Sequence, residues 1–415
     1  MPTTRTKHYQ PLAWLFSAVF LDHTSINIIF PVLTIVCFDP LSTLFSPETS
    51  LANRSMWYGL IISIYHLVNI VAAPLFGIAS DYLGRRKLLI IAGTGALCMG
   101  AFAALSLLAS SIGLLLLGRV IGGFCATKAV TQAAVGDLPA GQRKVINMAY
   151  LQAIIALGAL LGPLLGGFTA KQFYSTELNF SAPFLLATVF AALSLWAVWW
   201  KVPETLTHRP KPSVSAILRS IINLLKNHRI LYISGLLFLS QISWSMYYQY
   251  MPPLLKNKLG FSAPQLGLFL SMIAFWLVLT GSFGIKLVKR WFSLKQLMLG
   301  SGIISLVGLI CSVLALAYQT PWQTKLIWLA AIPVAAGDMI AYIVLTTLYS
   351  DSVVPEQQGL VMGLCLVVAQ LVWFLTGILG GVLLGIHFIL PLIIAPIGVM
   401  LLIGLLWLRP RFLHE

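Results

Sequence analysis

Four charged side chains lie inside long apolar stretches of the sequence, where a charge is costly. Asp22, Arg119, Lys128 and Asp338 each stand well within a run of about twenty mostly apolar residues. An ionised side chain at the centre of a bilayer costs about 2.5 to 3.5 kcal/mol on insertion scales, so it needs a partner, water or a proton. These residue types can carry protons or hold a charged ligand, and we expect function at these positions.

The composition predicts an all-α membrane protein. Of 415 residues, 59% are hydrophobic and only 9% are charged, with a mean hydropathy of +0.92, whereas soluble domains carry about a quarter charged residues. Segments of about twenty apolar residues span a bilayer. The sequence predicts twelve of them, near 12–36, 57–79, 87–109, 112–134, 146–169, 181–200, 231–251, 264–284, 295–317, 324–348, 359–382 and 386–408.

The basic residues predict the orientation of the chain. Most of the 26 Lys and Arg residues fall in loops on the side of the N-terminus, which places both termini in the cytoplasm. We expect a bacterial inner membrane. The net charge of +15 then marks topology and attraction to anionic lipid, and we expect no nucleic-acid partner. The five cysteines show no metal-ligand spacing, so we expect no metal site and no cofactor.

Two similar halves are predicted from internal repeats. The segment "GDLPAGQRKVINMA" before and into the fifth span is echoed by "SDSVVPEQQGLVMG" before and into the eleventh. Residues 1–200 and 230–415 are the predicted six-helix bundles. A charged linker, 201–229, joins them, and its second part can form an amphipathic helix on the membrane surface.

One loop carries a specific family resemblance. "GIASDYLGRRKLLI" resembles the loop motif of the major facilitator superfamily, with Gly77, Asp81, Gly84, Arg85 and Arg86 at the family's spacing. Weaker matches are "LDHTSINIIFPVL", "LGRVIGGFCA" and "GALLGPLLGG", the last similar to a signature of the family's exporters. Among subfamilies the chain looks most like twelve-helix drug:proton antiporters of the tetracycline-efflux type. The resemblance implies the major facilitator fold and a monomeric carrier of a small organic molecule and protons.

Elementary chemistry gives these motifs roles. Asp81 can accept hydrogen bonds from a helix N-terminus or an arginine, forming a gating latch that opens as the halves rock, while Arg85 and Arg86 hold the loop. The second half has Val288 where Asp81 would align, so the latch is asymmetric.

A row of small residues in the fifth span predicts a hinge or a leak seal. Small residues at four-residue spacing let another helix approach closely, and a proline removes a backbone donor and bends the helix. The residues concerned are Gly158, Gly162, Pro163, Gly166 and Gly167.

We predict that Asp22 and Arg119 couple protons to transport. In the resembled family the first and fourth helices flank one cavity. Asp22 would exchange a proton there, and Arg119 would stabilise its charged form when the two are close. Protonation would release the pair and bias the protein between its inward-open and outward-open forms. The alternative is a permanent structural bridge. Asp338 is a candidate second proton site or counter-ion for a cationic substrate, or has a structural role.

Lys128 departs from the tetracycline-type pattern, which has small residues at this point. It lies nine residues after Arg119, about 180° around an ideal helix, so both can face one cavity only if the helix is distorted. Gly122 and Gly123 can supply that distortion. A cavity-facing Lys128, beside Thr131 and Gln132, favours a substrate carboxylate; alternatively, the lysine snorkels toward the cytoplasm.

Polar and aromatic faces on other spans complete the predicted substrate cavity. On the seventh span four of them recur at i, i+3, i+4 and i+7, and on the second span two stand in a similar register, so each set shares a helix face that suits an organic molecule. They are Gln241, Trp244, Ser245 and Tyr248 on the seventh span, His66 and Asn69 on the second, and Tyr342 on the tenth. Trp and Tyr also serve as interfacial anchors, which is the alternative for the seventh span.

The predicted function is proton-coupled export by alternating access. The alternative within transport is proton symport that imports a carboxylate-bearing metabolite or a siderophore, held by Lys128 and Arg119. A membrane enzyme is disfavoured because the spans contain no HExxH, GxSxG or P-loop motif. A passive channel is disfavoured because two similar halves with isolated charges suit a rocking carrier.

Overall fold

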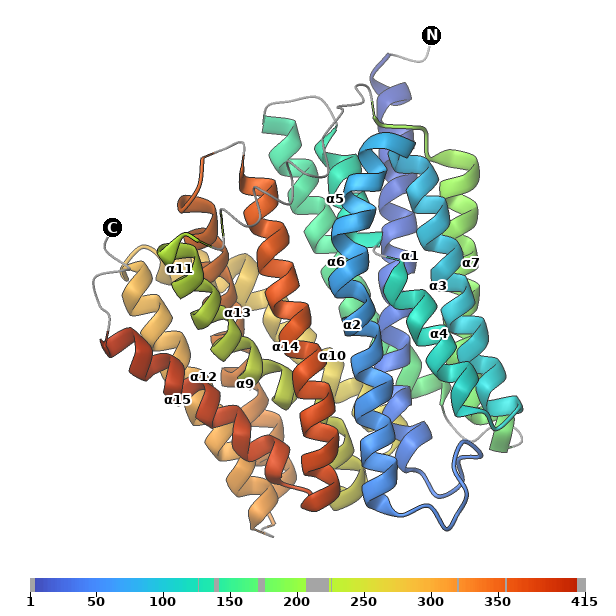
Figure 1. The fold of residues 1–415 in the computed structure, drawn as a ribbon, viewed down its shortest axis with the longest axis vertical. Coiled ribbons are helices and arrows are strands. Elements are labelled where there is room, and N and C mark those ends of the chain that lie inside the picture. The colour runs from blue at the N-terminus through green and yellow to red at the C-terminus, as the bar shows by residue number, and fades with distance from the viewer. Residues whose placement is uncertain are drawn as a thin grey trace. The chain divides into compact units, whose positions relative to one another are not determined.

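The structure, a computed structural model, describes residues 4–125, 127–137, 142–170, 176–206, 224, 226–318, 321–354 and 357–408. Regular secondary structure within these ranges is helical throughout (Figure 1). The helices are α1 (Thr4–Phe38), α2 (Leu51–Leu83), α3 (Arg85–Leu108), α4 (Ile112–Phe124), α5 (Thr127–Gly136), α6 (Gln142–Thr169), α7 (Thr176–Lys201), α9 (His228–Leu259), α10 (Ala263–Leu279), η1 (Thr280–Gly284), α11 (Ile285–Val288), α12 (Leu294–Ala317), α13 (Gln323–Asp351), α14 (Gln358–Ile386) and α15 (Leu390–Leu408).

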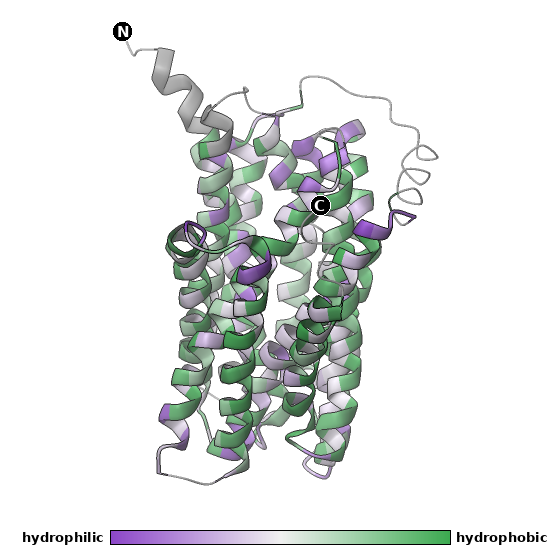
Figure 2. Cartoon of the chain, turned by 90° about the vertical axis from the view of Figure 1, so that its left-hand side faces the viewer, coloured by the Kyte–Doolittle hydropathy of each residue, from purple (hydrophilic) through white to green (hydrophobic). Residues whose placement is uncertain are grey.

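Twelve of the described segments are long and apolar enough to cross a membrane, which confirms the predicted number of spans. The pair α4 and α5 forms one crossing, and α10 with the π-helical η1 forms another. Figure 2 shows why these segments suit a membrane: hydrophobic residues run along the helix bodies, and hydrophilic residues gather toward helix ends and loops. Backbone groups in lipid must be satisfied within the chain, and helices achieve this.

Local sequence signals set several helix ends. Ser293 and Gln296 form a capping box at the start of α12, each side chain accepting a hydrogen bond from the other residue's backbone N–H. The side chain of Asn227 caps α9 in a similar way. Gly260 ends α9 with a φ of 64°, a left-handed conformation that glycine adopts without strain.

The chain divides into two compact units. Unit 1 comprises residues 1–50, 64–211 and 261–271, and unit 2 comprises 51–63, 212–260 and 272–415. The first part of α2 therefore packs within unit 2, and the first part of α10 within unit 1. The predicted bundles, 1–200 and 230–415, differ from these units mainly by those two helix segments. The amphipathic helix expected in the linker falls mostly on residues 207–223, outside the described residues.

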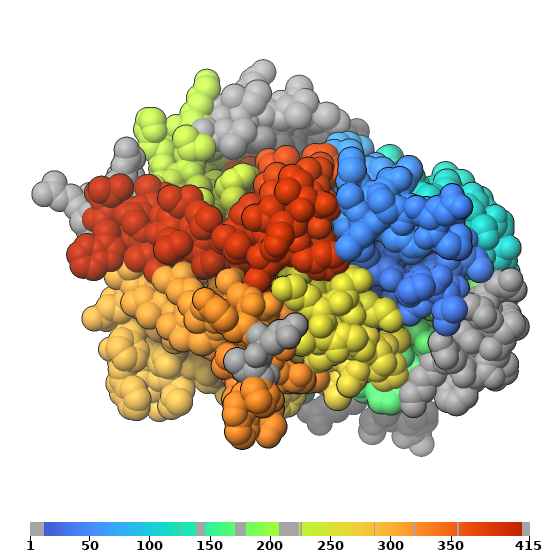
Figure 3. All heavy atoms as spheres, turned by 90° about the horizontal axis from the view of Figure 1, so that it is seen from below, coloured from blue at the N-terminus to red at the C-terminus, as the bar shows by residue number. Residues whose placement is uncertain are grey.

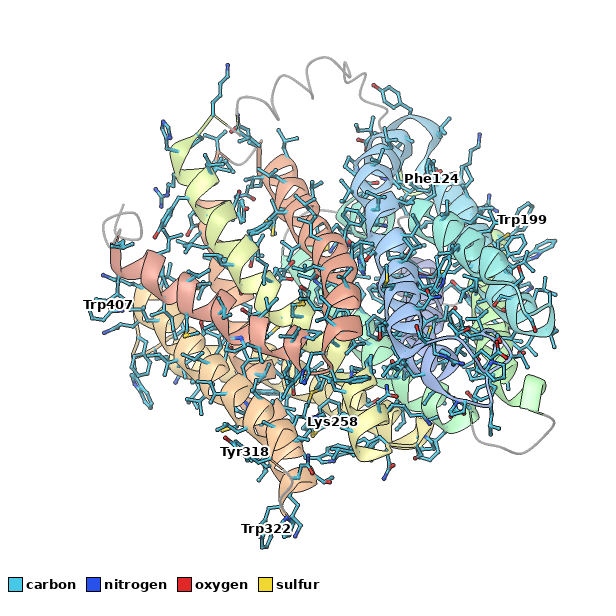
Figure 4. All side chains as sticks on the ribbon, turned by 60° about the horizontal axis from the view of Figure 1, so that its bottom comes forward. Phe124, Trp199, Lys258, Tyr318, Trp322 and Trp407 are labelled. Atoms are coloured by element: carbon cyan, nitrogen blue, oxygen red, sulfur yellow. The ribbon has the colours of Figure 1, made fainter. Side chains whose placement is uncertain are left out.

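Exposed aromatic side chains mark the ends of the helices. Trp322 (65% exposed) and Tyr318 lie with Lys258 at one end of unit 2, and Trp407 (76% exposed) lies at the other (Figure 4). The ammonium group of Lys258 donates a hydrogen bond to the carbonyl of Leu316 at 3.0 Å. Tryptophan and tyrosine favour the interface between lipid and water, so we expect these ends to lie at the two membrane surfaces.

The tight turn between α14 and α15 brings their adjoining ends together. The N–H of Leu390 donates to the carbonyl of His387 at 3.1 Å, immediately after α14 ends. Viewed from below, these ends form one continuous surface in orange-red and red (Figure 3).

The predicted fourth span is broken. Helix α4 ends at Phe124 and α5 begins at Thr127, because the N–H of Thr127 donates to Cys125 at 3.0 Å and so leaves the carbonyl of Gly123 without its helical donor. The side-chain amide of Asn69 on α2 donates to that carbonyl at 3.1 Å. A side chain that replaces a lost helical hydrogen bond stabilises such a break. The sequence had predicted one span over 112–134, with Gly122 and Gly123 as the residues that can supply a distortion.

Candidate functional site

Asp22 lies on α1 in unit 1 and is only 4% exposed. No described residue makes a well-formed hydrogen bond to its carboxylate oxygens, although the side chain of Thr127 interacts with them. The ring nitrogen Nδ1 of His23 is 3.8 Å from Oδ2 of Asp22 and 3.2 Å from the carbonyl of Val19. A buried carboxylate without donors needs a proton, water or a cation to offset its lost hydration. Asp22 is therefore a candidate for a group that binds and releases a proton or a cation.

Tyr65 stands beside both Asp22 and Arg119. The guanidinium carbon of Arg119, buried on α4, lies 4.7 Å from the centroid of the Tyr65 ring, within cation–π distance. Tyr65 also interacts electrostatically with Asp22. Because the Asp22 oxygens accept no hydrogen bond from the described residues, Arg119 does not donate to Asp22 in this structure. The three residues, from α1, α2 and α4, are named here the Asp22 site.

The break between α4 and α5 changes where Lys128 points. Gly123 packs tightly on α2, since an added Cβ would lie 2.6 Å from the carbonyl oxygen of Tyr65. Beyond the break, Lys128 is exposed and interacts electrostatically with His23. Lys128 thus lies near the turn of α1 that carries Asp22, although an ideal helix would place it opposite Arg119. The glycine pair expected to allow a distortion directly precedes the break.

The other residues predicted near this site either donate hydrogen bonds to backbone carbonyls or lie beside the Asp22 site. Asn69 donates to the carbonyl of Gly123, and the hydroxyl of Thr131 donates to the carbonyl of Thr127 at 2.8 Å. The ring of His66 packs edge-to-face on Tyr65 at 5.4 Å, and Gln132 is half-buried. Asn69 and Thr131 therefore hold the broken crossing in shape, which their spacing alone had not indicated.

Arg85 is the centre of the loop motif. Its Nη1 lies 2.6 Å from Oδ1 of Asp81 and also contacts the hydroxyl of Ser80, while its Nε donates to Oδ2 of Asp137 at 2.8 Å. The guanidinium is buried and joins the ends of α2, α3 and α5. Asp81 thus accepts from an arginine, the second of the two partners expected for it. Charge-assisted bonds of this kind are among the stronger contacts in proteins.

Glu204 occupies the N-terminus of α3. Its carboxylate accepts hydrogen bonds from the backbone N–H of Arg85 at 2.8 Å and of Arg86 at 3.2 Å. Arg86 in turn donates from its side chain to the carbonyl of Trp199. Gly84, between α2 and α3, has a φ of 98°, and an added Cβ would lie 2.9 Å from the carboxyl carbon of Glu204. Glycine is thus required at position 84 by conformation and by space, whereas an added Cβ at Gly77 would meet nothing within 4 Å.

We predict that Glu204→Gln destabilises unit 1. The substitution keeps the shape of the cap and removes the charge that favours the positive end of α3, with an expected loss of about 1 kcal/mol. Thermal unfolding of the purified protein measures it. The control is Glu48→Gln, in the matching tripeptide Pro47-Glu48-Thr49, where the glutamate is exposed. Equal melting temperatures for the two variants would contradict a stabilising role for the cap.

The glycine row of α6 packs against α1 beside the Asp22 site. An added Cβ at Gly158 would lie 2.9 Å from Cβ of His23, and one at Gly162 would lie 2.5 Å from Cβ of Asn27. Gly166 continues this contact at Ile28. The helix expected to approach the glycines is therefore α1 itself.

The other side of the glycine row meets α10. An added Cβ at Gly167 would lie 3.0 Å from Cα of Gly267, and Gly267 also packs on the carbonyl oxygen of Pro163. The hydroxyl of Ser271 donates to the carbonyl of Leu160 at 2.7 Å. All of these residues belong to unit 1. One face of α6 thus holds α1, and another holds the start of α10.

An aromatic cluster in unit 2 contains the predicted face of α9. The rings of Trp244 and Tyr248 are 5.3 Å apart, and those of Tyr248 and Trp373 are 5.9 Å apart. The indole N–H of Trp373, on α14, donates to the side-chain oxygen of Gln241 at 3.2 Å. The hydroxyl of Ser245 donates to the carbonyl of Gln241 and accepts from Thr376. The ring planes are tilted by 31° and 54°, and such aromatic faces with amide and hydroxyl partners can bind an organic group.

Asp338 and Tyr342 lie one turn apart on α13. Tyr342 packs against the apolar core of unit 2 and interacts electrostatically with Asp338. Oδ1 of Asp338 is buried and accepts no hydrogen bond from the described residues. Asp338 lines a small cavity together with Trp244. Asp338 is thus a second intramembrane carboxylate, in a unit different from that of Asp22.

Sequence reasoning missed Tyr65, Asp137, Glu204 and Trp373 as parts of these sites. Glu204 lies three residues after the end of α7 and gave no signal of its partner, a backbone N–H of α3. The aromatic residues gave none either, since such residues are common in apolar spans.

Comparison with known proteins agrees with this architecture. The family model of the Major Facilitator Superfamily matches residues 15–377. The class E tetracycline resistance protein of Escherichia coli is 30% identical over 188 residues, 45% of this chain and 42% of its own. Major facilitator superfamily domain-containing protein 10 of Bos taurus is 33% identical over 181 residues, 43% of this chain and 37% of its own. The matches thus span less than half the length of these relatives.

Solved structures share the fold over almost the whole chain. The human organic anion transporter MFSD10 (TETRAN) has a TM-score of 0.68 at 20% identity, covering 96% of this chain and 99% of its own. The D-xylose-proton symporter has a TM-score of 0.74 at 19% identity, covering 94% and 97%. The match over residues 15–377 and the twelve crossings lead to one conclusion: the chain belongs to the major facilitator superfamily.

Proposed function

We propose that this protein is a proton-coupled secondary transporter that exports a small organic molecule by alternating access. The observation that carries the proposal is the Asp22 carboxylate, buried on α1 without a hydrogen-bond donor among the described residues. A carboxyl in that position can bind a proton from one side of the membrane and release it to the other. The tetracycline resistance relatives support export.

Arg119 would control the protonation of Asp22 by approaching and leaving it. In this structure its guanidinium lies over Tyr65, 4.7 Å from the ring centroid. A movement of α4 against α1 would exchange the aromatic partner for the carboxylate. A group that binds a proton in only one of two states shifts the equilibrium between them. The Asp22 site would in this way couple proton binding to the change of state.

The loop motif and the glycine row would set the states. We propose that Arg85, with Asp81 and Asp137, stabilises one state through its buried charge pairs. Gly158, Gly162 and Gly166 would let α1 and α6 move as a closely packed pair.

Both termini would face the cytoplasm, because most basic loop residues lie on the side of the N-terminus. The membrane would be a bacterial inner membrane, as in the bacterial organisms of the tetracycline resistance relatives. The working form would be a monomer.

We propose Lys128, in unit 1, as one substrate contact and the aromatic cluster of α9 and α14, in unit 2, as a separate one. Lys128 is exposed near α1, and its charge suits a substrate carboxylate. This observation also supports the second candidate function, proton symport that imports a carboxylate-bearing metabolite or a siderophore. The similarity to an organic anion transporter and to a proton symporter in fold fits that candidate as well.

Mass spectrometry of whole cells tests the direction and names the substrate. Cells that make the protein or its Asp22→Asn variant are compared by untargeted profiling of lysates and media. Under the proposal, a compound leaves the cells only when Asp22 is intact. Accumulation of a compound inside the cells would instead establish import. Identical profiles for the two proteins would contradict a role for Asp22 in transport.

A further inference from the structure

Two contacts, one turn apart, hold α4 against α2 inside unit 1. In the first, the guanidinium carbon of Arg119 on α4 lies 4.7 Å from the centroid of the Tyr65 ring on α2. In the second, the side-chain amide of Asn69 donates to the carbonyl of Gly123 at 3.1 Å. Residues four apart lie on one face of a helix. The two contacts therefore form one continuous seam between the helices.

Close backbone packing fixes the position of Tyr65 in this seam. An added Cβ at Gly123 would lie 2.6 Å from the carbonyl oxygen of Tyr65 and 3.2 Å from its Cα. Another face of α4 packs on α3, since an added Cβ at Gly118 would lie 3.1 Å from the carbonyl oxygen of Met99. Helix α4 is thus held between two backbones, and the Tyr65 ring is presented to Arg119 from a firm support.

The Tyr65 ring offers the arginine an alternative to a carboxylate. The negative face of an aromatic ring attracts a guanidinium within about 6 Å of its centroid, and the attraction is stronger where both groups are shielded from water. Arg119 is buried. Tyr65 interacts electrostatically with both Arg119 and Asp22. The ring therefore stands where it can compete with the carboxylate for the same cation.

Other titratable or charged groups near the carboxylate come from several elements. They are His23 on α1, His66 on α2 against the Tyr65 ring, Cys125 between α4 and α5, and Lys128 on α5 near His23. These groups stay in the protein when only the ring at position 65 is changed. A comparison of variants at that position therefore isolates the contact between the ring and Arg119.

We propose that Tyr65 is a positioning residue that holds Arg119 away from Asp22 and so lets the carboxyl keep its proton. The inference rests on the proposed function, in which Asp22 carries the proton, and it names the side chain that regulates this site. An arginine close to a carboxylate stabilises the charged form. A ring that competes for the arginine therefore favours the protonated form.

Infrared spectroscopy of the purified full-length protein in lipid nanodiscs detects the proton on Asp22 directly. A protonated carboxyl group has a C=O stretching band that a carboxylate lacks, and the band that Asp22→Asn removes belongs to Asp22. The only ligand used is the proton, supplied by the pH of the buffer. At the pH where the natural protein shows half of its full band, Tyr65→Leu is expected to reduce the band to about a quarter or less of the full band, a loss of about threefold or more in proton affinity.

The electronic character of the ring separates the cation–π contact from packing. Tyr65→Phe keeps the ring and is expected to retain most of the band. Phenylalanines that carry one, two or three fluorine atoms at this position keep nearly the same shape, but each fluorine weakens the negative face, so the band is expected to fall stepwise. Tyr150→Leu is the control, because Tyr150 is 57% exposed on α6, and we expect the full band. If Tyr65→Leu does not fold, the fluorinated series decides the question.

The outcomes separate this inference from the proposed function. A band that Asp22→Asn removes, but that stays equal along the fluorinated series and in folded Tyr65→Leu, would overturn the role of Tyr65 and leave Asp22 as the proton carrier. If Asp22→Asn removes no band at any pH, the proposed function fails, and the role of Tyr65 fails with it.

Discussion

Asp22→Asn is expected to reduce substrate accumulation driven by a pH gradient to the level of protein-free vesicles. Asparagine has nearly the volume of aspartate, so the packing of α1 is kept. Its amide does not bind or release a proton at the pH values of such an assay. Asp22 is 4% exposed and accepts no hydrogen bond from the described residues. Its contacts include the His23 ring nitrogen at 3.8 Å and the side chain of Thr127, both of which an amide can keep, so we expect the variant to fold.

Proteoliposomes that contain the substrate found by mass spectrometry provide the measurement. In an antiporter a proton leaves as the substrate enters, so an acidic interior drives uptake; in a symporter an acidic exterior does so. Exchange of labelled for unlabelled substrate requires no net proton movement, and we expect Asp22→Asn to retain it. Loss of driven uptake with retained exchange would identify Asp22 as the coupling group.

Asp39→Asn is the matched control. Asp39 directly follows α1, and its carboxylate accepts a hydrogen bond from the backbone N–H of Leu41 at 3.0 Å. It lies in a turn outside the apolar span, so we expect gradient-driven uptake to be unchanged. If Asp22→Asn behaves like Asp39→Asn, the carboxylate is a structural group and the proposed coupling is wrong.

The twelve crossings could be predicted because each depends on one local property. A run of about twenty apolar residues must leave water, and its backbone must form a helix. The break after Phe124 could not be predicted in the same way. Its stability depends on Asn69, whose side-chain amide reaches the carbonyl of Gly123 from another helix at 3.1 Å. Hydropathy contains no information about that bond.

The sequence predicted the site residues that are unusual by themselves, and it missed those whose role depends on a partner elsewhere in the chain. Asp22, Arg119 and Asp338 stand out because a charge in an apolar run is rare. The carboxylate of Glu204 accepts a hydrogen bond from the backbone N–H of Arg85, 119 residues away in the sequence. A backbone group has no signature in the sequence. Tyr65 and Trp373 acquire their roles from the rings and charges beside them. A single sequence identifies costly residues better than it identifies their neighbours.

The contact between α1 and α6 connects the predicted hinge to the Asp22 site. Gly158 packs on His23, the residue after Asp22, and Gly162 packs on Asn27, five residues after it. The glycines therefore set how closely α6 lies behind the carboxylate. A change in this spacing would move the turn of α1 that carries Asp22 relative to α4. Packing of small residues is a main source of helix association in membranes, where lipid provides no hydrophobic drive.

Gly162→Ala is expected to lower the melting temperature by several degrees and to reduce gradient-driven uptake. The added methyl carbon would lie 2.5 Å from Cβ of Asn27 and 2.9 Å from the carbonyl oxygen of Thr24. Because one of these neighbours is backbone, the clash cannot be relieved by rotating a side chain, and α1 must move away. Overpacking of this kind costs about 1 to 3 kcal/mol. Melting in nanodiscs and uptake in proteoliposomes measure the two effects.

Gly235→Ala supplies the comparison for this prediction. Gly235 lies inside α9, and an added Cβ there would meet nothing within 4 Å. Alanine favours a helix over glycine by about 1 kcal/mol, so this variant is expected to melt at the same temperature as the natural protein or slightly higher, with unchanged uptake. Both variants replace glycine by alanine inside a helix, so the effect of helix propensity is common to them. The difference between their melting temperatures then reports the α1–α6 contact. Equal behaviour would mean that α6 does not hold α1 at this spacing in the working protein, and the glycine row would lose its assignment as the hinge behind Asp22.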